Sequence, residues 1–217
     1  MLGLETSVRL PLQFDPDRLQ KDLKAIEHVH MQSHYGGYHD GKWSAIGLVS
    51  QGGQSDELHV GSGRYEKTEI VKHTPYFNEV LDTFRCDKQR VRLMALAPGG
   101  KIFEHWDTDE TIDSGIARIH IPIVTHKDVV FVLAGKRVRW MPGEVWYGDF
   151  SFPHHLENRS NINRVHMVLD LVVNDFLVGL FPKGYVEQKT WRRYSRKLHL
   201  TACAYRMKMQ GRSPGAA

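Results

Sequence analysis

The chain has few of the features that mark secreted or membrane proteins. Only two of its 217 residues are cysteines, Cys86 and Cys203, and they form no CxxC pair. We therefore expect two reduced thiols in a cytoplasmic protein, and no disulfide framework or cysteine zinc site. The chain contains no run of about 18 apolar residues, the length needed to span a membrane. The first residues also lack the basic start and apolar stretch of a secretory signal, and none is expected.

A strong excess of one charge is also missing from most of the chain. The 29 Lys and Arg residues and the 25 Asp and Glu residues leave a net charge of +4. From Lys183 onward, nine bases and a single acid, Glu187, give +8, so residues 1–182 carry −4. The basic character therefore belongs to the C-terminal segment. It gives no argument for nucleic acid as a partner, and none is expected.

Short segments with alternating polar and apolar residues predict a mainly β protein. The first part of the chain is expected to form an edge strand over residues 9–14, a helix that begins at Asp15 and Pro16, a strand over 42–49 and a helix over 74–84. Eight strands are then expected over residues 90–96, 102–105, 117–124, 129–133, 137–141, 145–147, 154–157 and 164–172, before helices at 175–181 and beyond 185. Their regular spacing predicts a double-stranded β-helix, the jelly-roll or cupin-like fold, with flanking N- and C-terminal helices.

Two histidines and a carboxylate are the most informative residues. His105 and Asp107 are two positions apart, so in an extended segment their side chains point to the same side and can bind one ion. His154 follows 47 residues after Asp107, which is enough chain to return on the opposite sheet. Two imidazoles and one carboxylate on one face of an Fe(II) ion form the facial triad of non-haem iron oxygenases, which leaves three positions open.

An arginine ten residues after His154 adds to this pattern. Arg164 is expected to begin the next strand and to point into the same barrel mouth, where a guanidinium suits the distal carboxylate of 2-oxoglutarate. Arg118 and His120 share one face of their strand and supply a second cationic or donor pair. The alternative is that all of these are ordinary surface or core groups, because 13 histidines make a chance His-x-Asp pair common.

Several motifs within residues 40–172 match a known family. They are Gly41-Lys-Trp43, Arg92-Leu-Met-Ala-Leu-Ala-Pro-Gly-Gly100, Ile102-Phe-Glu-His105-Trp-Asp107, Arg118-Ile-His-Ile-Pro122, Pro142-Gly-Glu144-Val-Trp146, Asp149-Phe-Ser-Phe-Pro-His154-His-Leu-Glu-Asn158 and Arg164-Val-His-Met-Val-Leu-Asp170. In these motifs the chain resembles the aspartyl/asparaginyl β-hydroxylases, a branch of the Fe(II)/2-oxoglutarate dioxygenases that includes bacterial proline cis-hydroxylases. We expect this dioxygenase domain over residues 1–182, with its motif core at about 40–172, and a basic helical extension over 183–217.

The resemblance implies a cofactor set and a role for each motif residue. It implies iron binding by His105, Asp107 and His154, the distal carboxylate of 2-oxoglutarate on Arg164, and assistance near the chelating end from Arg118 and His120. The implied reaction uses O2 and hydroxylates an amino acid or an aspartyl, asparaginyl or prolyl-like residue, while 2-oxoglutarate becomes succinate and CO2. The carboxylate at Asp107 fits the proline-hydroxylase-like branch and argues against a halogenase.

Other functions remain as alternatives. The substrate is expected to be a free amino acid, a small peptide or a carrier-tethered residue. A non-catalytic cupin-like module that binds a small acid or a metal would use the same fold without turnover. A cupin isomerase or a cysteine-type dioxygenase usually has three histidine ligands, so Asp107 and Arg164 disfavour it.

Two tryptophans are expected to line a substrate pocket. Trp43 and Trp106 lie within the matching motifs, although most aromatic side chains in a β-barrel belong simply to the core. His34, Tyr35 and His39 belong to a glycine-containing loop, which is either a lid over the site or a mobile surface loop.

The C-terminal segment has aromatic residues among its bases. We expect a helix that docks its aromatic side, with Trp191, Tyr194 and Tyr205, on the barrel and leaves its lysines and arginines in water. The alternative is a cationic surface for an acidic partner, such as a carrier protein, or the interface of a homodimer.

Overall fold

The structure, a computed structural model, describes residues 5–34, 37–108 and 110–211. Its strands are β1 (Ser7–Gln13), β2 (Gln32–Ser33), β3 (Trp43–Gln51), β4 (Tyr65–Lys67), β5 (Lys88–Leu96), β6 (Lys101–His105), β7 (Ile116–Val124), β8 (Val129–Leu133), β9 (Lys136–Val138), β10 (Glu144–Gly148), β11 (His154–Asn158) and β12 (Arg164–Val172). Its helices are α1 (Pro16–Ala25), α2 (Glu69–Lys72), α3 (Pro75–Thr83), α4 (Asp175–Gly179), α5 (Lys183–Glu187) and α6 (Lys189–Met209).

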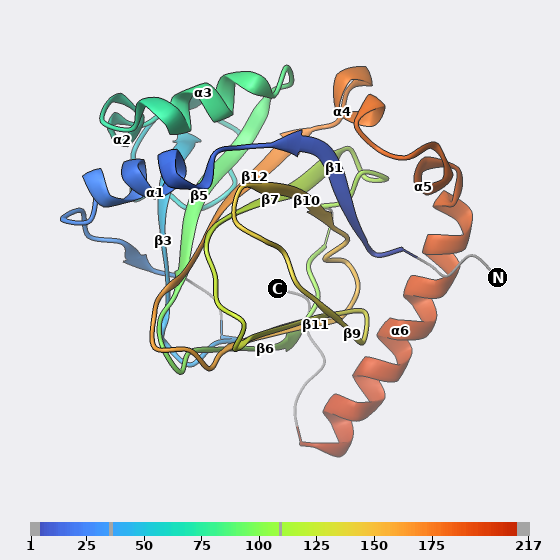
Figure 1. The fold of residues 1–217 in the computed structure, drawn as a ribbon. Coiled ribbons are helices and arrows are strands. Elements are labelled where there is room, and N and C mark those ends of the chain that lie inside the picture. The colour runs from blue at the N-terminus through green and yellow to red at the C-terminus, as the bar shows by residue number, and fades with distance from the viewer. Residues whose placement is uncertain (1–4, 35–36, 109, 212–217) are drawn as a thin grey trace.

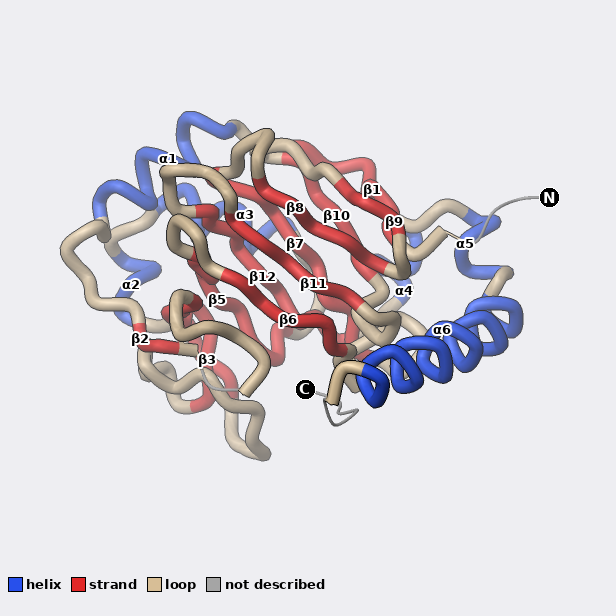
Figure 2. The backbone as a smooth tube through the Cα atoms, turned by 90° about the horizontal axis from the view of Figure 1, so that it is seen from below, coloured by secondary structure: helices blue, strands red, loops and turns tan. Residues whose placement is uncertain are grey.

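Two antiparallel sheets face each other and enclose the interior of a barrel (Figure 1). The larger sheet has the order β1-β10-β7-β12-β5-β3-β2, with β4 beside β3, and the smaller sheet has the order β6-β11-β8-β9. Figure 2 shows the smaller sheet in front of the larger one. This arrangement is the predicted double-stranded β-helix, and the mainly β fold class with flanking helices is confirmed.

The two faces of the larger sheet differ because side chains alternate along each strand. On β12, Met167 and Leu169 are buried in the apolar core shared with α1 and α3, whereas Arg164 and Val168 line a cavity between the sheets. The strands β5 and β7 alternate in the same way. Arginines and histidines of three neighbouring strands therefore share the interior face, while the apolar positions between them hold the helices.

Helices α1, α2 and α3 cover the outer face of the larger sheet (Figure 1). Asp15 caps α1 as predicted, because its carboxylate accepts hydrogen bonds from the backbone N–H groups of Asp17 at 2.9 Å and Arg18 at 3.2 Å. The side chains of Leu19 and Phe77 are fully buried beneath the helices. Within the part of the chain that the structure describes, no helix is both long and apolar enough to cross a membrane.

Some elements differ from the sequence-based prediction. The strands β2 and β4 and the helix α2 were not predicted, because segments of two to four residues carry no readable periodicity. The strand β9 is shorter than the predicted segment 137–141. The strand β1 does lie at an edge of its sheet, where Pro11 removes no hydrogen bond from a central ladder.

The orientation of α6 is the reverse of what we expected. The residues that it buries are Arg192, Ser195, Cys203 and Met207, whereas its aromatic side chains face outward. Buried ion pairs explain the difference, because the Arg192 guanidinium lies 2.8 Å from the carboxylate of Asp113 and turns that side of the helix inward. The face of α6 that docks is therefore fixed by polar contacts and by the buried Cys203 and Met207, and not by the aromatic rings.

Candidate active site

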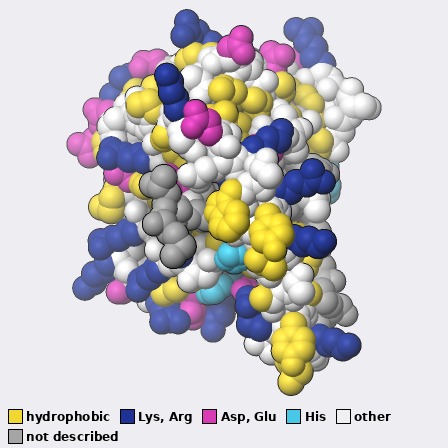
Figure 3. All heavy atoms as spheres, turned by 90° about the vertical axis from the view of Figure 1, so that its right-hand side faces the viewer, with side chains coloured by type: hydrophobic (Ala, Val, Ile, Leu, Met, Phe, Trp, Pro, Cys, Tyr) yellow, Lys and Arg dark blue, Asp and Glu magenta, His cyan; other side chains and the backbone are white. Residues whose placement is uncertain are grey.

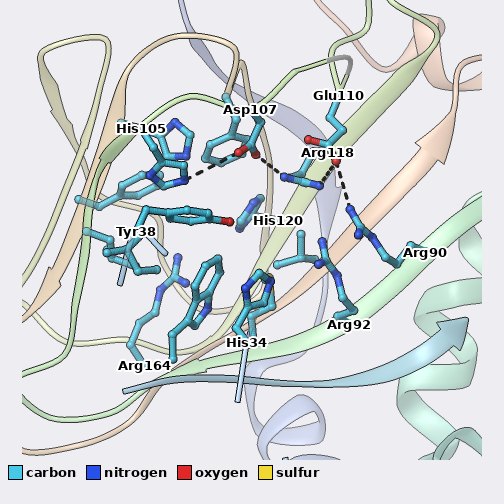
Figure 4. Close-up of a pocket in the computed structure, with 18 of the residues that line it drawn as sticks. His34, Tyr38, Arg90, Arg92, His105, Asp107, Glu110, Arg118, His120 and Arg164 are labelled. Atoms are coloured by element: carbon cyan, nitrogen blue, oxygen red, sulfur yellow. Dashed lines mark hydrogen bonds and ion pairs between the residues drawn. The ribbon is translucent and has the colours of Figure 1, made fainter. Parts of the chain in front are cut away.

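The interior of the barrel holds a cavity of about 280 Å³. It is lined by His34, Tyr38, Trp43, Val60, Arg90, Arg92, Met94, Ile102, His105, Asp107, Glu110, Arg118, His120, Phe131, Phe150, His154, Leu156, Arg164 and Val168. In Figure 4 the labelled side chains converge on this space from several strands and from the loop before β3. The structure thus brings together every site residue predicted from the sequence except Trp106.

His105, Asp107 and His154 form one buried cluster. One ligand atom of each lies within 4.8 Å of the others. The Nε2 atom of His105 is 3.8 Å from Oδ1 of Asp107, and the centroids of the two imidazole rings are 4.2 Å apart. Two imidazoles and a carboxylate at this spacing fit the donor set of a facial iron site.

Backbone carbonyls orient both imidazoles. The Nδ1–H group of His105 donates to the carbonyl of Phe103 at 2.7 Å, and that of His154 donates to the carbonyl of Phe152 at 3.0 Å. Such a bond fixes the tautomer of a metal-binding histidine and leaves Nε2 for the ion. Burial is the main cause that lowers the pKa of His105 to about 3 and that of His154 to about 4. Both rings are therefore neutral at pH 7, which is the form that binds a metal.

The strand pairing that joins the two histidines differs from our expectation. We expected His154 on the opposite sheet, but β11 pairs with β6 in the smaller sheet and places His154 opposite His105. The chain crosses to the larger sheet as β7 and β10 and returns each time, which the length of the intervening segment does not reveal. Asp107 follows β6 and is held by a hydrogen bond from its backbone N–H to the carbonyl of Phe150 at 2.9 Å.

Arg118 lies against three carboxylates. It donates hydrogen bonds to Asp107, to Glu110 at 2.5 Å and to Asp170 at 2.7 Å. Burial alone would lower the pKa of Arg118, but these carboxylates raise it well above its ordinary value. The guanidinium is therefore a fixed cation that orients the carboxylate of Asp107. The predicted contact of Arg118 with 2-oxoglutarate stays a prediction.

Two further arginines of the cavity were not predicted as site residues. Arg90 and Arg92 lie 2.8 and 3.4 Å from the carboxylate of Asp170, and Arg90 also lies 3.1 Å from Glu110. Figure 4 shows Arg90 and Arg118 reaching Glu110 from β5 and β7, the two strands that flank β12. The sequence did carry a signal, because Arg90 and Arg92 alternate with Val91 and so share one face of their strand.

Arg164 occupies a different environment, six residues along β12 from Asp170. Only 5% of its surface is exposed, and its Nη2 atom donates to Nδ1 of His166 at 2.9 Å. No carboxylate of the described residues forms an ion pair with it, and burial lowers its pKa to about 9. His120 is also buried, and neither of its ring nitrogens has a hydrogen-bond partner within the described residues. Buried polar groups of this kind need a partner, and the pair fits an anionic ligand.

Aromatic side chains form one wall of the cavity. The Trp43 side chain stacks on His34 with ring centroids 3.7 Å apart, and Tyr38 stacks on His105 at 4.0 Å. The loop that we considered as a lid therefore contributes His34 and Tyr38 to the wall, while Tyr35 lies outside the described residues.

Trp106 is placed differently from Trp43. It lies between His105 and Asp107, which both line the cavity, whereas its own side chain does not. Because neighbouring side chains of an extended segment point to opposite sides, the inward direction of His105 and Asp107 turns Trp106 away from the interior.

Two facing antiparallel sheets around a buried His-Asp-His cluster define a double-stranded β-helix protein of the non-haem metal class. The chain belongs to the aspartyl/asparaginyl beta-hydroxylase family, whose sequence profile matches residues 13–173.

Individual relatives share less than a third of their residues with this chain. The chain is similar to the L-proline cis-4-hydroxylase of Rhizobium meliloti (strain 1021), with 29% identity over 179 residues that cover 81% of this chain and 62% of the relative. In fold it is similar to an oxidoreductase of the 2OG-Fe(II) oxygenase family from Burkholderia pseudomallei, with a TM-score of 0.53, 13% identity and coverage of 77% of this chain and 84% of that one. It is also similar to HygX from Streptomyces hygroscopicus, solved with nickel and 2-oxoglutarate bound, with a TM-score of 0.51, 8% identity and coverage of 78% and 84%.

Proposed function

We propose that this protein is an Fe(II)- and 2-oxoglutarate-dependent dioxygenase that hydroxylates an amino acid. One observation carries the proposal. The cluster of His105, Asp107 and His154 faces the same cavity as Arg164, a buried guanidinium with no carboxylate partner in the described part of the chain. A metal triad and an anion site in one cavity are what a dicarboxylate co-substrate bound beside iron requires. Membership of the hydroxylase family supports the same reaction class.

The three ligands would hold Fe(II), which supplies the activation of O2 and the decarboxylation of 2-oxoglutarate. The protein fixes the ligands and excludes water. The carbonyls of Phe103 and Phe152 hold the imidazoles, and Arg118 holds the carboxylate of Asp107. The apolar side chains of the wall, Phe131, Phe150 and Leu156, keep the reacting groups away from bulk water.

Arg164 is the residue that we propose for the distal carboxylate of 2-oxoglutarate. A guanidinium can bind a carboxylate through two parallel hydrogen bonds, and the bond to His166 already restrains its orientation. Burial, followed by the nearby positive charge of Arg164, lowers the pKa of His120 well below its ordinary value, so this ring is neutral. A neutral imidazole offers one N–H donor, which supports a contact between His120 and the co-substrate.

The other end of the cavity supports an amino acid as the substrate. Three guanidinium groups, those of Arg90, Arg92 and Arg118, lie there with the carboxylates of Glu110 and Asp170. Asp107 balances the third guanidinium as long as no metal is bound. Once Asp107 binds the metal, Glu110 and Asp170 leave one positive charge in excess at this end, which suits a substrate carboxylate. We propose L-proline or a similar free amino acid, in line with the curated relative. A peptide or a carrier-tethered residue is the alternative, and it has no free carboxylate at that position.

We place the enzyme in the cytoplasm. The chain holds only two cysteines, Cys86 and Cys203, and they form no disulfide with each other, as is usual in a reducing compartment.

The first test is an anaerobic titration of the apo-protein with Fe(II) and 2-oxoglutarate, followed by visible absorption. We expect a charge-transfer band that is lost in Arg164→Ala and kept in Arg137→Ala, a control at an exposed arginine. Binding of 2-oxoglutarate without the band and without succinate formation would instead identify a non-catalytic binding module.

The second test compares L-proline with L-prolinamide in an assay for succinate. If the excess positive charge binds the substrate carboxylate, the amide should be a much poorer substrate, by roughly 100-fold or more. Equal turnover of both would remove the free amino acid from the proposal and favour a peptide or tethered substrate.

A further inference from the structure

The helix α6 is fixed to the body of the protein at several points. Arg192 pairs with Asp113 at 2.8 Å, Arg196 pairs with Asp149 at 3.2 Å, and Arg206 reaches Glu104 at 2.9 Å. Because these contacts run along the length of the helix, the face opposite to them is held outward. Figure 1 shows α6, in red, running beside the barrel.

The outward face of α6 carries a row of exposed large hydrophobic side chains. Trp191, Tyr194, Leu198, Tyr205 and Met209 are exposed by 54%, 60%, 56%, 67% and 72%. Their spacings of three, four, seven and four residues place them on one side of a helix. Figure 3 shows large hydrophobic side chains exposed on this side of the molecule, with Lys and Arg side chains beside them. We call these five residues the α6 stripe.

The charge beside the α6 stripe has one sign. The helix contains seven Lys or Arg residues and no Asp or Glu. Arg192, Arg196 and Arg206 are engaged by acids of the body. Arg193, Lys197 and Lys208 are exposed and lie along one flank of the stripe by helical periodicity.

We propose that the α6 stripe is a docking surface for an acidic amphipathic helix of a partner protein. This inference goes beyond the enzymatic function and does not depend on it. A narrow stripe with three- and four-residue spacing is the seam of a helix pair, and the charges that flank such a seam select the partner. Aromatic residues are also enriched at the centres of protein interfaces.

The same observations disfavour two other occupants. In an antiparallel pair of identical helices, the same flank of each copy lies on the same side of the seam, so Arg193, Lys197 and Lys208 of both copies would adjoin. No acid in α6 offsets this repulsion in any self-pairing. A membrane surface prefers an apolar face wider than a single seam.

The experiment measures binding of the full chain to a labelled synthetic helix with leucine at its seam positions and glutamate at the flanks, by fluorescence anisotropy. We expect saturable binding that weakens when salt is raised from about 0.05 M to about 0.3 M. Leu198→Glu and Lys197→Glu should each weaken binding by roughly tenfold or more. Lys21→Glu on α1, where the lysine is also exposed, is the matched control and should change nothing.

Three further measurements distinguish the acidic helix from a second copy of the chain and from a membrane surface. A version of the peptide with lysine at the flanks should not bind, and the chain should sediment as a monomer. Vesicles rich in phosphatidylglycerol should bind less tightly than the acidic peptide. Peptide binding that survives both Leu198→Glu and Lys197→Glu, a dimer that Leu198→Glu dissociates, or tighter binding to vesicles would each overturn the proposal. Because Leu198 and Lys197 are exposed, circular dichroism should confirm that both variants keep the fold.

Discussion

Two arginines on the interior face of the same sheet have opposite surroundings. Arg118 is enclosed by the carboxylates of Asp107, Glu110 and Asp170. Arg164 is buried more completely, but its hydrogen bond is to the neutral ring of His166 and no carboxylate of the described residues pairs with it. Burying a charge costs several kcal/mol unless it is paired.

The difference predicts an architectural role for Arg118 and a ligand-binding role for Arg164. The charge of Arg118 is satisfied within the protein, so it serves to hold Asp107 and the neighbouring strands. Arg164 has no such carboxylate within the described residues, which favours its proposed role in binding an anion that enters the cavity. A buried cation without an anion therefore indicates a binding site more directly than a cluster of paired charges does.

The largest effect is expected where a metal ligand is removed, because neither arginine has a role in turnover without the metal. His105→Ala or His154→Ala should abolish turnover of 2-oxoglutarate, a loss of roughly 1000-fold or more. His155→Ala is the control, since His155 is next to a ligand in sequence but does not line the cavity. Succinate formation measures the effect, and wild-type turnover in either ligand variant would contradict the metal assignment.

Substitutions in the cluster of Arg90, Arg92, Arg118 and Asp170 should mainly lower the stability of the protein. Asp170→Asn removes the buried anion between Arg90, Arg92 and Arg118 and should cost about 3 kcal/mol in the free energy of unfolding. Urea denaturation measures this cost. Asp128→Asn, at an exposed strand-end aspartate, is the control and should change stability little.

The same residue predicts a dependence on pH. Burial alone would raise the pKa of Asp170, but Arg118, Arg90 and Arg92 together hold it well below its ordinary value. A carboxyl group with a depressed folded-state pKa stabilises the protein fully at neutral pH, and that contribution is lost as pH falls below the unfolded value of about 4. The wild type should therefore lose more stability than Asp170→Asn between pH 6 and acid. Equal acid sensitivity of both proteins would contradict this assignment.

Substitution of Arg164 should weaken the binding of 2-oxoglutarate and leave the stability of the protein nearly unchanged. Arg164→Ala should raise the KM for 2-oxoglutarate by roughly 100-fold, because two charge-assisted hydrogen bonds are lost. The KM of Arg164→Lys should lie between those of the wild type and Arg164→Ala, since a lysine keeps the charge but not the planar guanidinium. The comparison would fail if Arg164→Ala destabilised the fold as strongly as Asp170→Asn while leaving the KM unchanged.

The smallest expected effect is a difference in the KM for the amino acid between variants of Trp43 and Trp106. Trp43→Ala opens one wall of the cavity and should raise the KM for the amino acid by roughly tenfold. Trp106→Ala should leave this KM within about twofold, because its side chain points away from the cavity. The reverse order would show that the interior wall does not contact the substrate.

Much of the fold followed from local patterns in the sequence. The alternation of polar and apolar residues located all eight strands from β5 to β12, and Asp15 with Pro16 located the start of α1. The very short elements β2, β4 and α2 were not predicted, because their conformation depends on the neighbours that they contact. The outward orientation of the aromatic residues on α6 was not predicted for a similar reason. Asp113 and Asp149, which are far away in the sequence, pair with the arginines of its inner face.

The sequence by itself determined the chemistry available to this protein: an HxD pair, a second histidine, an arginine ten residues later and a strand pattern that builds a barrel around them. These are properties of residue type and short-range spacing. Only the tertiary structure decided that His154 lies opposite His105 on a neighbouring strand, that Arg118 is enclosed by carboxylates and that Arg164 is not. Strand register and the pairing of distant charges depend on long-range packing, which no local pattern encodes.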